Sequence, residues 1–300
     1  MIQPLARRLP CRRLLISLSF CLPLLVCSVS LAEEPAQPFM RVTRDANGEL
    51  KAMETSIVSY AADANAPYPD ATVDLVSAVH VGEPEYYDEL NRAFKTYDAV
   101  LYELIAPRGT IPVPGEDGRP TSAVSTIQLA ITDALQLEFQ LKGIDYRAKN
   151  FVHADTSPDE FFASMERRGE SFFQMFLRAM QAGFSAEQQQ MGKAAEVQLL
   201  MLLIESDPAK RALGLKRLIA IQFKNSDVLI QAINGEEGST LISGRNDAAL
   251  EVLKEQLAAG KKKLAIFYGG GHMEDFDKKL RRDFKLHPTG VRWLEAWHLD

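Results

Sequence analysis

The sequence has 300 residues, of which 46% are hydrophobic and 25% charged, an ordinary composition for a globular protein with a full-size apolar core. The formal net charge is −6 and no basic stripe occurs, so we expect no nucleic-acid partner. All three cysteines precede residue 33, which excludes disulfides, thiolate metal ligands and cysteine nucleophiles from the remainder of the chain.

Residues 1–32 have the pattern of a secretory signal peptide. Four arginines precede an uncharged apolar run at residues 14–32, and Ser30 and Ala32 fit the small-residue positions before a cleavage site. We therefore expect export to the periplasm or the extracellular space. The run is also just long enough to span a bilayer, so an uncleaved anchor at residues 14–32 is the alternative, and the only membrane association that we expect.

Strand patterns dominate the next part of the chain. Residues 39–60 predict a hairpin, because "DANGEL" is flanked by two runs in which apolar and polar residues alternate. Residues 71–105 predict a β-α-β unit with two buried parallel strands. The proline- and glycine-rich residues 106–120 predict an irregular loop of the kind that forms lids. Residues 121–143 predict a single helix that ends at Gly143.

Helical spacing then continues over residues 157–260, which predicts a helical insertion of about that extent. The strand "KKLAIFYGG", the helix "HMEDFDKKLRRDF" and the alternating strand "TGVRWLEAWHL" complete the chain. This order predicts an α/β fold with a mixed, largely parallel central sheet flanked by helices, in which early and late strands share one sheet. We expect residues 33–300 to form a single domain.

Three of the predicted strands lead into residues that can carry chemistry. The first ends at His80, the second delivers Glu103, and the third runs through three glycines to His272. Because ligands collect beyond the carboxyl ends of parallel strands, these side chains would converge if the strands are neighbours. Two imidazoles and a carboxylate suit zinc or another divalent first-row metal. The alternative at each position is structural: a hydrogen-bonding histidine, or glycines that only form a tight turn.

The glycines Gly269, Gly270 and Gly271 would let the backbone approach a ligand, and the following helical turn would offer N–H groups to an oxyanion. Tyr268 is either a second oxyanion donor or a half-buried strand residue. Glu83 follows His80 by three residues and is either a general base or a solvated acid in a first helical turn, and we expect the second.

Four segments resemble the TraB/GumN family, which is related to the Tiki metalloproteases: "VSAVHVGEPEYYDEL", "YDAVLYELIAPRG", "LKGIDYRA" and "LAIFYGGGHMEDFDKKLRRDF". The similarity extends from about residue 40 to the C-terminus. The family pattern is two Gly-x-x-His motifs and a glutamate. Residues 269–272 match one motif, residues 77–80 match the other with Ser77 in place of glycine, and Glu103 matches the glutamate. The resemblance implies divalent-metal-dependent peptide hydrolysis.

Asp145 and Arg147 in "GIDYRA" resemble another recurrent segment of the family. An arginine near a metal would clamp a substrate carboxylate or stabilise an oxyanion. The alternative is a structural Asp–Arg pair.

These observations predict an exported metal-dependent hydrolase that acts on a peptide or another small molecule. His80 and His272 would be ligands of zinc, manganese or cobalt, and Glu103 would be the third ligand or the base. Two alternatives stay open. One is a metal-free hydrolase similar to the erythromycin esterase relatives, with a histidine general base. The other is a non-catalytic protein that binds a peptide or haem. The sequence leaves the oligomeric state open.

Overall fold

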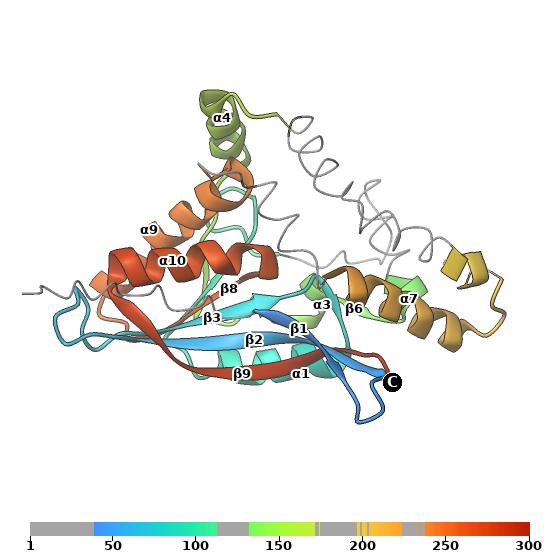
Figure 1. Ribbon diagram of the computed structural model, residues 1–300. Coiled ribbons are helices and arrows are strands. Elements are labelled where there is room, and N and C mark those ends of the chain that lie inside the picture. The colour runs from blue at the N-terminus through green and yellow to red at the C-terminus, as the bar shows by residue number, and fades with distance from the viewer. Residues whose placement is uncertain are drawn as a thin grey trace, which may run out of the picture. The chain divides into compact units, whose positions relative to one another are not determined.

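A mixed seven-stranded sheet organises the computed structural model, which describes residues 39–112, 132–171, 174, 197–198, 200–202, 204–223, 234 and 238–300 (Figure 1). The strand order is β1-β2-β3-β8-β5-β7, and β9 pairs with β2. The strands β3, β8, β5 and β7 run parallel, whereas β1, β2 and β9 pair in the antiparallel sense. The predicted α/β class with a largely parallel central sheet is therefore confirmed. The strands are β1 (Met40–Arg44), β2 (Leu50–Ala62), β3 (Thr72–Ala78), β5 (Ala99–Tyr102), β7 (Phe151–His153), β8 (Lys263–Gly269) and β9 (Leu286–His298).

Helices cover both faces of this sheet. Figure 1 shows α1 on one face and α10 on the other. None of the described helices is long and apolar enough to cross a membrane. The helices are α1 (Pro84–Phe94), α3 (Gln140–Gly143), α4 (Pro158–Arg168), α7 (Pro208–Phe223), the π-helical turn η1 (Thr240–Gly244), α9 (Arg245–Ala258), the 3₁₀ turn η2 (Gly270–His272) and α10 (Met273–Phe284).

The late strand β8 lies between the two early strands β3 and β5. It pairs in parallel with β3 over residues 72–78 and with β5 over residues 99–102. The predicted β-α-β unit of residues 71–105 thus exists with parallel strands, but its strands are not adjacent. Early and late parts of the chain share one sheet, as the element order predicted.

The predicted hairpin is also present, as β1 and β2 with a turn at residues 45–49. Along one edge β2 pairs with β9 from residue 52 to residue 62. Its other edge is shared: residues 50–55 pair with β1 and residues 57–61 pair with β3. The start of β1 therefore lies next to the end of β3, which brings Met40 to the edge of the sheet where the candidate site lies.

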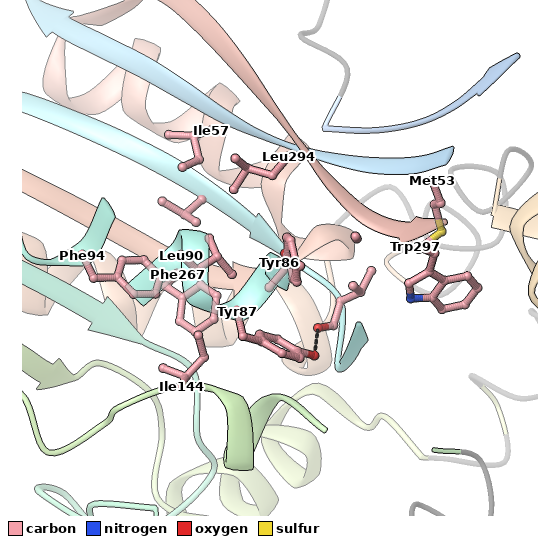
Figure 2. Close-up of a cluster of buried hydrophobic side chains, with 14 of the residues drawn as sticks. Met53, Ile57, Tyr86, Tyr87, Leu90, Phe94, Ile144, Phe267, Leu294 and Trp297 are labelled. Atoms are coloured by element: carbon pink, nitrogen blue, oxygen red, sulfur yellow. Dashed lines mark hydrogen bonds between the residues drawn. The ribbon is translucent and has the colours of Figure 1, made fainter. Parts of the chain in front are cut away.

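Alternate residues of the parallel strands enter two separate cores, so each strand is buried on both faces. In β8, Ile266 and Tyr268 join the core under α9 and α10, whereas Ala265 and Phe267 join the core over α1. Figure 2 shows this second core, in which Phe267 packs near Leu90 and Phe94 of α1. The alternation explains why these strands read as continuous apolar runs.

The prediction of a single helix over residues 121–143 is wrong for residues 132–143, the part of this range that the structure describes. Gln136 has φ of 53°, a left-handed conformation that ends the helical turn before it. The next residues form the short strand β6 (Glu138–Phe139), which pairs with β4 (Val81–Gly82) directly after His80. Tertiary pairing overrides the helical spacing here, and only α3 ends at Gly143 as expected.

Other predicted segments lie partly or wholly outside the described residues. These are the signal segment at residues 1–32, residues 113–120 of the loop after β5, and several stretches of the insertion predicted for residues 157–260. The described parts of that insertion include α4, α7, η1 and α9.

Candidate active site

The structure brings His80, Glu103 and His272 together. They follow the carboxyl ends of β3, β5 and β8, which are neighbours in the sheet. His272 Nε2 lies 3.7 Å from Glu103 Oε1. A methyl group placed on Gly269 would lie 3.4 Å from Glu103 Oε2 and 4.0 Å from His80 Nε2. The His272 imidazole therefore approaches one oxygen of the carboxylate, and His80 and the other oxygen both lie near the same position beside Gly269.

Glu103 is an ionised, hydrogen-bonded carboxylate. Its Oε2 accepts the backbone N–H of Gly269 at 2.8 Å, and its Oε1 accepts Nη2 of Arg245 at 2.8 Å. Burial alone would raise the pKa of Glu103. His272 in its protonated form, the Arg245 guanidinium, the Gly269 N–H and His80 together outweigh burial and lower this pKa to about 2. The carboxylate is thus charged throughout the physiological pH range.

Arg245 is a site residue that sequence reasoning missed. It opens α9, directly after the π-helical turn η1, and its guanidinium binds Glu103 and both oxygens of Asp155. The Asp155 side chain is fully buried. Arg245, rather than the predicted site residue Arg147, is therefore the arginine that contacts Glu103. The available signal was "SGRND", in which an arginine and an asparagine follow a glycine at a helix start.

His272 is a buried imidazole with a defined tautomer. It ends the turn η2 and directly precedes α10, so its predicted place at a helix start is confirmed. Its Nδ1 lies 2.6 Å from Oδ1 of Asn246, which can only accept, so Nδ1 carries the proton. Burial lowers the pKa of His272, with Glu103 opposing that effect, so the ring is neutral at neutral pH.

His80, in contrast, is exposed, and helix α1 fixes the backbone before it. The Tyr87 hydroxyl donates to the Val79 carbonyl oxygen at 3.3 Å (Figure 2), and the Tyr86 hydroxyl donates to the Ser77 carbonyl oxygen at 3.3 Å. The His80 carbonyl oxygen accepts the backbone N–H of Gln140 at 2.8 Å. The exposed ring thus stands on a fixed backbone, on the open side of the site.

Two of the three glycines have a specific spatial role. Gly269 leaves room next to Glu103 and His80, and Gly270 leaves room for the side chains of Met40 and Ser77. Gly271 lies between them and His272 in the turn η2. Gly269 and Gly270 therefore allow close approach at the site, and the three glycines together form a tight turn from strand to helix.

Other predicted site residues are engaged elsewhere. The buried Tyr268 hydroxyl donates to the Ala154 carbonyl oxygen, which ties β8 to the end of β7. Asp145 accepts the backbone N–H of Arg147 at 3.1 Å, so the two residues form a turn contact. Arg147 is exposed, and within the described residues its guanidinium makes no ion pair or hydrogen bond.

The expectation that Glu83 is a solvated acid is wrong. Glu83 is buried, and its Oε1 lies 2.6 Å from Nζ of Lys216 in α7 and accepts the backbone N–H of His298 at 3.2 Å. The sequence offered no sign of this pair, because the partner lies 133 residues away.

His153 has a structural role within the described residues. Its Nε2 donates to the Leu104 carbonyl oxygen at 2.6 Å, and its Nδ1 accepts the Gly109 N–H at 3.3 Å. It therefore holds the start of the loop that follows Glu103.

The donor atoms at the site are of the types that bind a divalent metal, but the side chains do not lie close enough together to coordinate one ion. Within the described part of the chain, no group of three histidine, cysteine or acidic side chains stands ready to hold an ion. Glu103, His80 and His272 nevertheless supply one oxygen and two nitrogen donors, and the Nδ1–H of His272 is held as in metal-ligating histidines. The chemistry of the donor set therefore fits a metal, and binding would require the three side chains to move closer.

No family model, curated protein or solved structure matches this chain. The TraB/GumN resemblance therefore stays a prediction.

Proposed function

We propose that the chain is an exported metal-dependent hydrolase whose centre contains His80, Glu103 and His272. The observation that carries the proposal is the approach of the His272 imidazole to one ionised carboxylate, with Nε2 at 3.7 Å from Glu103 Oε1, and with His80 beside the same Gly269 that Glu103 contacts. The peptide substrate is an inference from the TraB/GumN resemblance, and export is an inference from residues 1–32. Zinc, manganese and cobalt all suit nitrogen and oxygen donors of this kind.

A bound divalent ion would polarise a carbonyl group and lower the pKa of a water molecule. The residues of the chain would divide the remaining tasks. Glu103 has a pKa of about 2, far below the range that suits a general base at neutral pH, so it acts as a ligand. His272 offers an unprotonated Nε2 from a buried position. The exposed His80 lies where a substrate would enter.

Metal analysis of protein purified without chelator tests this proposal, together with hydrolysis of a peptide library before and after chelation. We expect one ion per chain in the wild type and loss of the ion in His80→Ala and in His272→Ala. His287→Ala is the matched control, because His287 is half exposed and pairs with Asp63 at 3.1 Å. Metal retained in both site variants would refute the proposal.

A metal-free hydrolase with a histidine base is the second candidate. The position of Arg245 favours it, because the guanidinium already supplies a positive charge at Glu103 Oε1. Hydrolysis that resists chelation and is lost in His80→Ala or His272→Ala would support this candidate over the first. A Soret band on addition of haem, without hydrolysis, would contradict both.

A further inference from the structure

The carboxamide of Asn246 is buried behind His272, and its orientation is fixed by three contacts. Nδ2 donates to the His272 carbonyl oxygen at 3.0 Å and to Asp275 Oδ2 at 2.8 Å. Both partners are acceptors, so an amide turned by 180° would place its oxygen against two other oxygens. Oδ1 must therefore face Nδ1 of His272, at 2.6 Å.

This orientation decides which ring nitrogen of His272 is protonated. Glu103 Oε1 lies 3.7 Å from Nε2, and a carboxylate next to a neutral imidazole favours a proton on the nearer nitrogen. Asn246 Oδ1 competes for that proton from the other side of the ring, at a shorter distance. We propose that Asn246 is a positioning residue that keeps the proton on Nδ1 and so directs the Nε2 lone pair toward Glu103.

A buried lysine supports Asn246 from behind. Lys279 Nζ lies 2.7 Å from Asp275 Oδ2, the oxygen that accepts from Asn246. It also lies 2.7 Å from Asp247 Oδ1 and donates to the Ser243 carbonyl oxygen at 3.0 Å. The lysine thus ties the first turn of α10 to the start of α9. A continuous chain of contacts therefore extends from Lys279 through Asp275 and Asn246 to the imidazole.

The inference deepens the proposed function, and its consequence for metal binding rests on that function. A histidine whose Nδ1–H is held by an acceptor presents Nε2 as the ligand atom, and loss of such a partner weakens metal affinity about 10- to 100-fold. The tautomer itself does not depend on a metal, so it can be measured in the metal-free protein.

Long-range ¹H–¹⁵N spectra of the five histidine side chains test the inference, because the nitrogen shifts distinguish the two tautomers. His272 is assigned from the signals that His272→Gln lacks. In chelator-treated wild type at neutral pH, we expect the Nδ1–H tautomer. Asn246→Leu should move the proton to Nε2, toward Glu103.

The control is Asn47→Leu in the exposed turn between β1 and β2, which should leave the His272 signals unchanged. Unchanged signals of the other histidines show that each variant is folded. Competition with a chelator should then show zinc binding to Asn246→Leu about 10- to 100-fold weaker than to the wild type.

A wild-type His272 in the Nε2–H form, or an Nδ1–H form that persists in Asn246→Leu, would overturn the inference. If the tautomer shifts as expected while even the wild type binds no metal, the role of Asn246 stands and the proposed metal-dependent function fails. The two results are therefore distinguishable.

Discussion

Removal of the Arg245 guanidinium should destabilise the fold strongly, because the guanidinium is the ion-pair partner of two carboxylates, Asp155 and Glu103. The side chains of Arg245 and Asp155 are 7% and 0% exposed, and three hydrogen bonds join the guanidinium to Asp155 and Glu103. Loss of one partner from a buried ion pair costs about 3–5 kcal/mol. The net lowering of the Glu103 pKa from 4.5 to about 2, after burial has opposed its stabilising groups, corresponds to about 3 kcal/mol, which is a similar scale.

We therefore expect Arg245→Met to lower the free energy of unfolding by about 3–5 kcal/mol at pH 7. Arg245→Lys keeps the charge without the planar fork, so its loss should be smaller. The sign of the pH dependence follows from Glu103, whose pKa in the folded state is higher in Arg245→Met than in the wild type. The difference in stability is then complete at pH 7 and shrinks as the pH falls through the variant's pKa toward about 2.

Urea unfolding followed by circular dichroism at pH 7 and pH 4 measures these differences. Excess chelator excludes any contribution from bound metal. Arg282→Met is the control, because Arg282 is 69% exposed and pairs with its neighbour Asp283. A loss below about 1 kcal/mol, or an equal loss at both pH values, would show that the guanidinium does not neutralise buried charge in the way proposed.

Three further outcomes are open to measurement. Glu83→Gln should lose about 3–5 kcal/mol in urea unfolding because it strands the Lys216 charge, and Glu83→Gln/Lys216→Met should recover most of it; a double variant as unstable as the single one would contradict a buried pair. Gly143→Ala should lose about 1–3 kcal/mol because its methyl group overlaps the ring of Tyr87, whereas Gly290→Ala, with open space around it, should not lose stability; equal effects would rule out the packing argument. His153→Ala should speed proteolysis and amide exchange at residues 104–109, and unchanged rates would show that His153 does not hold that segment.

The sheet and the convergence of three site residues were predictable from the sequence, because both follow from local patterns. The apolar runs of β3, β5 and β8 are buried on both faces, and each run leads into a residue with a functional side chain. Once such strands are parallel neighbours, their carboxyl ends must share one edge of the sheet. The prediction failed at residues 132–143, where pairing of β6 with β4 outweighs helical spacing.

The residues that control charge at the site were not predictable in the same way. Arg245, Asp155 and Asn246 act through partners 26 to 142 residues distant along the chain. A surface ion pair and a buried one have the same sequence signature, since only the tertiary fold determines which side chains lose water. Glu83 shows the same limit, because its position at the start of α1 suits a solvated acid equally well.

The charges around Glu103 bear on the choice between the two proposed chemistries. Arg245 makes two hydrogen bonds to Asp155 and one to Glu103, so most of its positive charge is matched by the buried Asp155. One guanidinium and two carboxylates leave one negative charge, and the neutral His272 does not cancel it. The oxygen of Glu103 that does not bind Arg245, Oε2, faces Gly269 and accepts its N–H. A divalent cation complements an anionic site of this kind, whereas an anionic substrate group would be repelled. Arg245 is therefore compatible with a metal ion, because it sets the position of Glu103 and leaves the negative charge of the site available to a ligand.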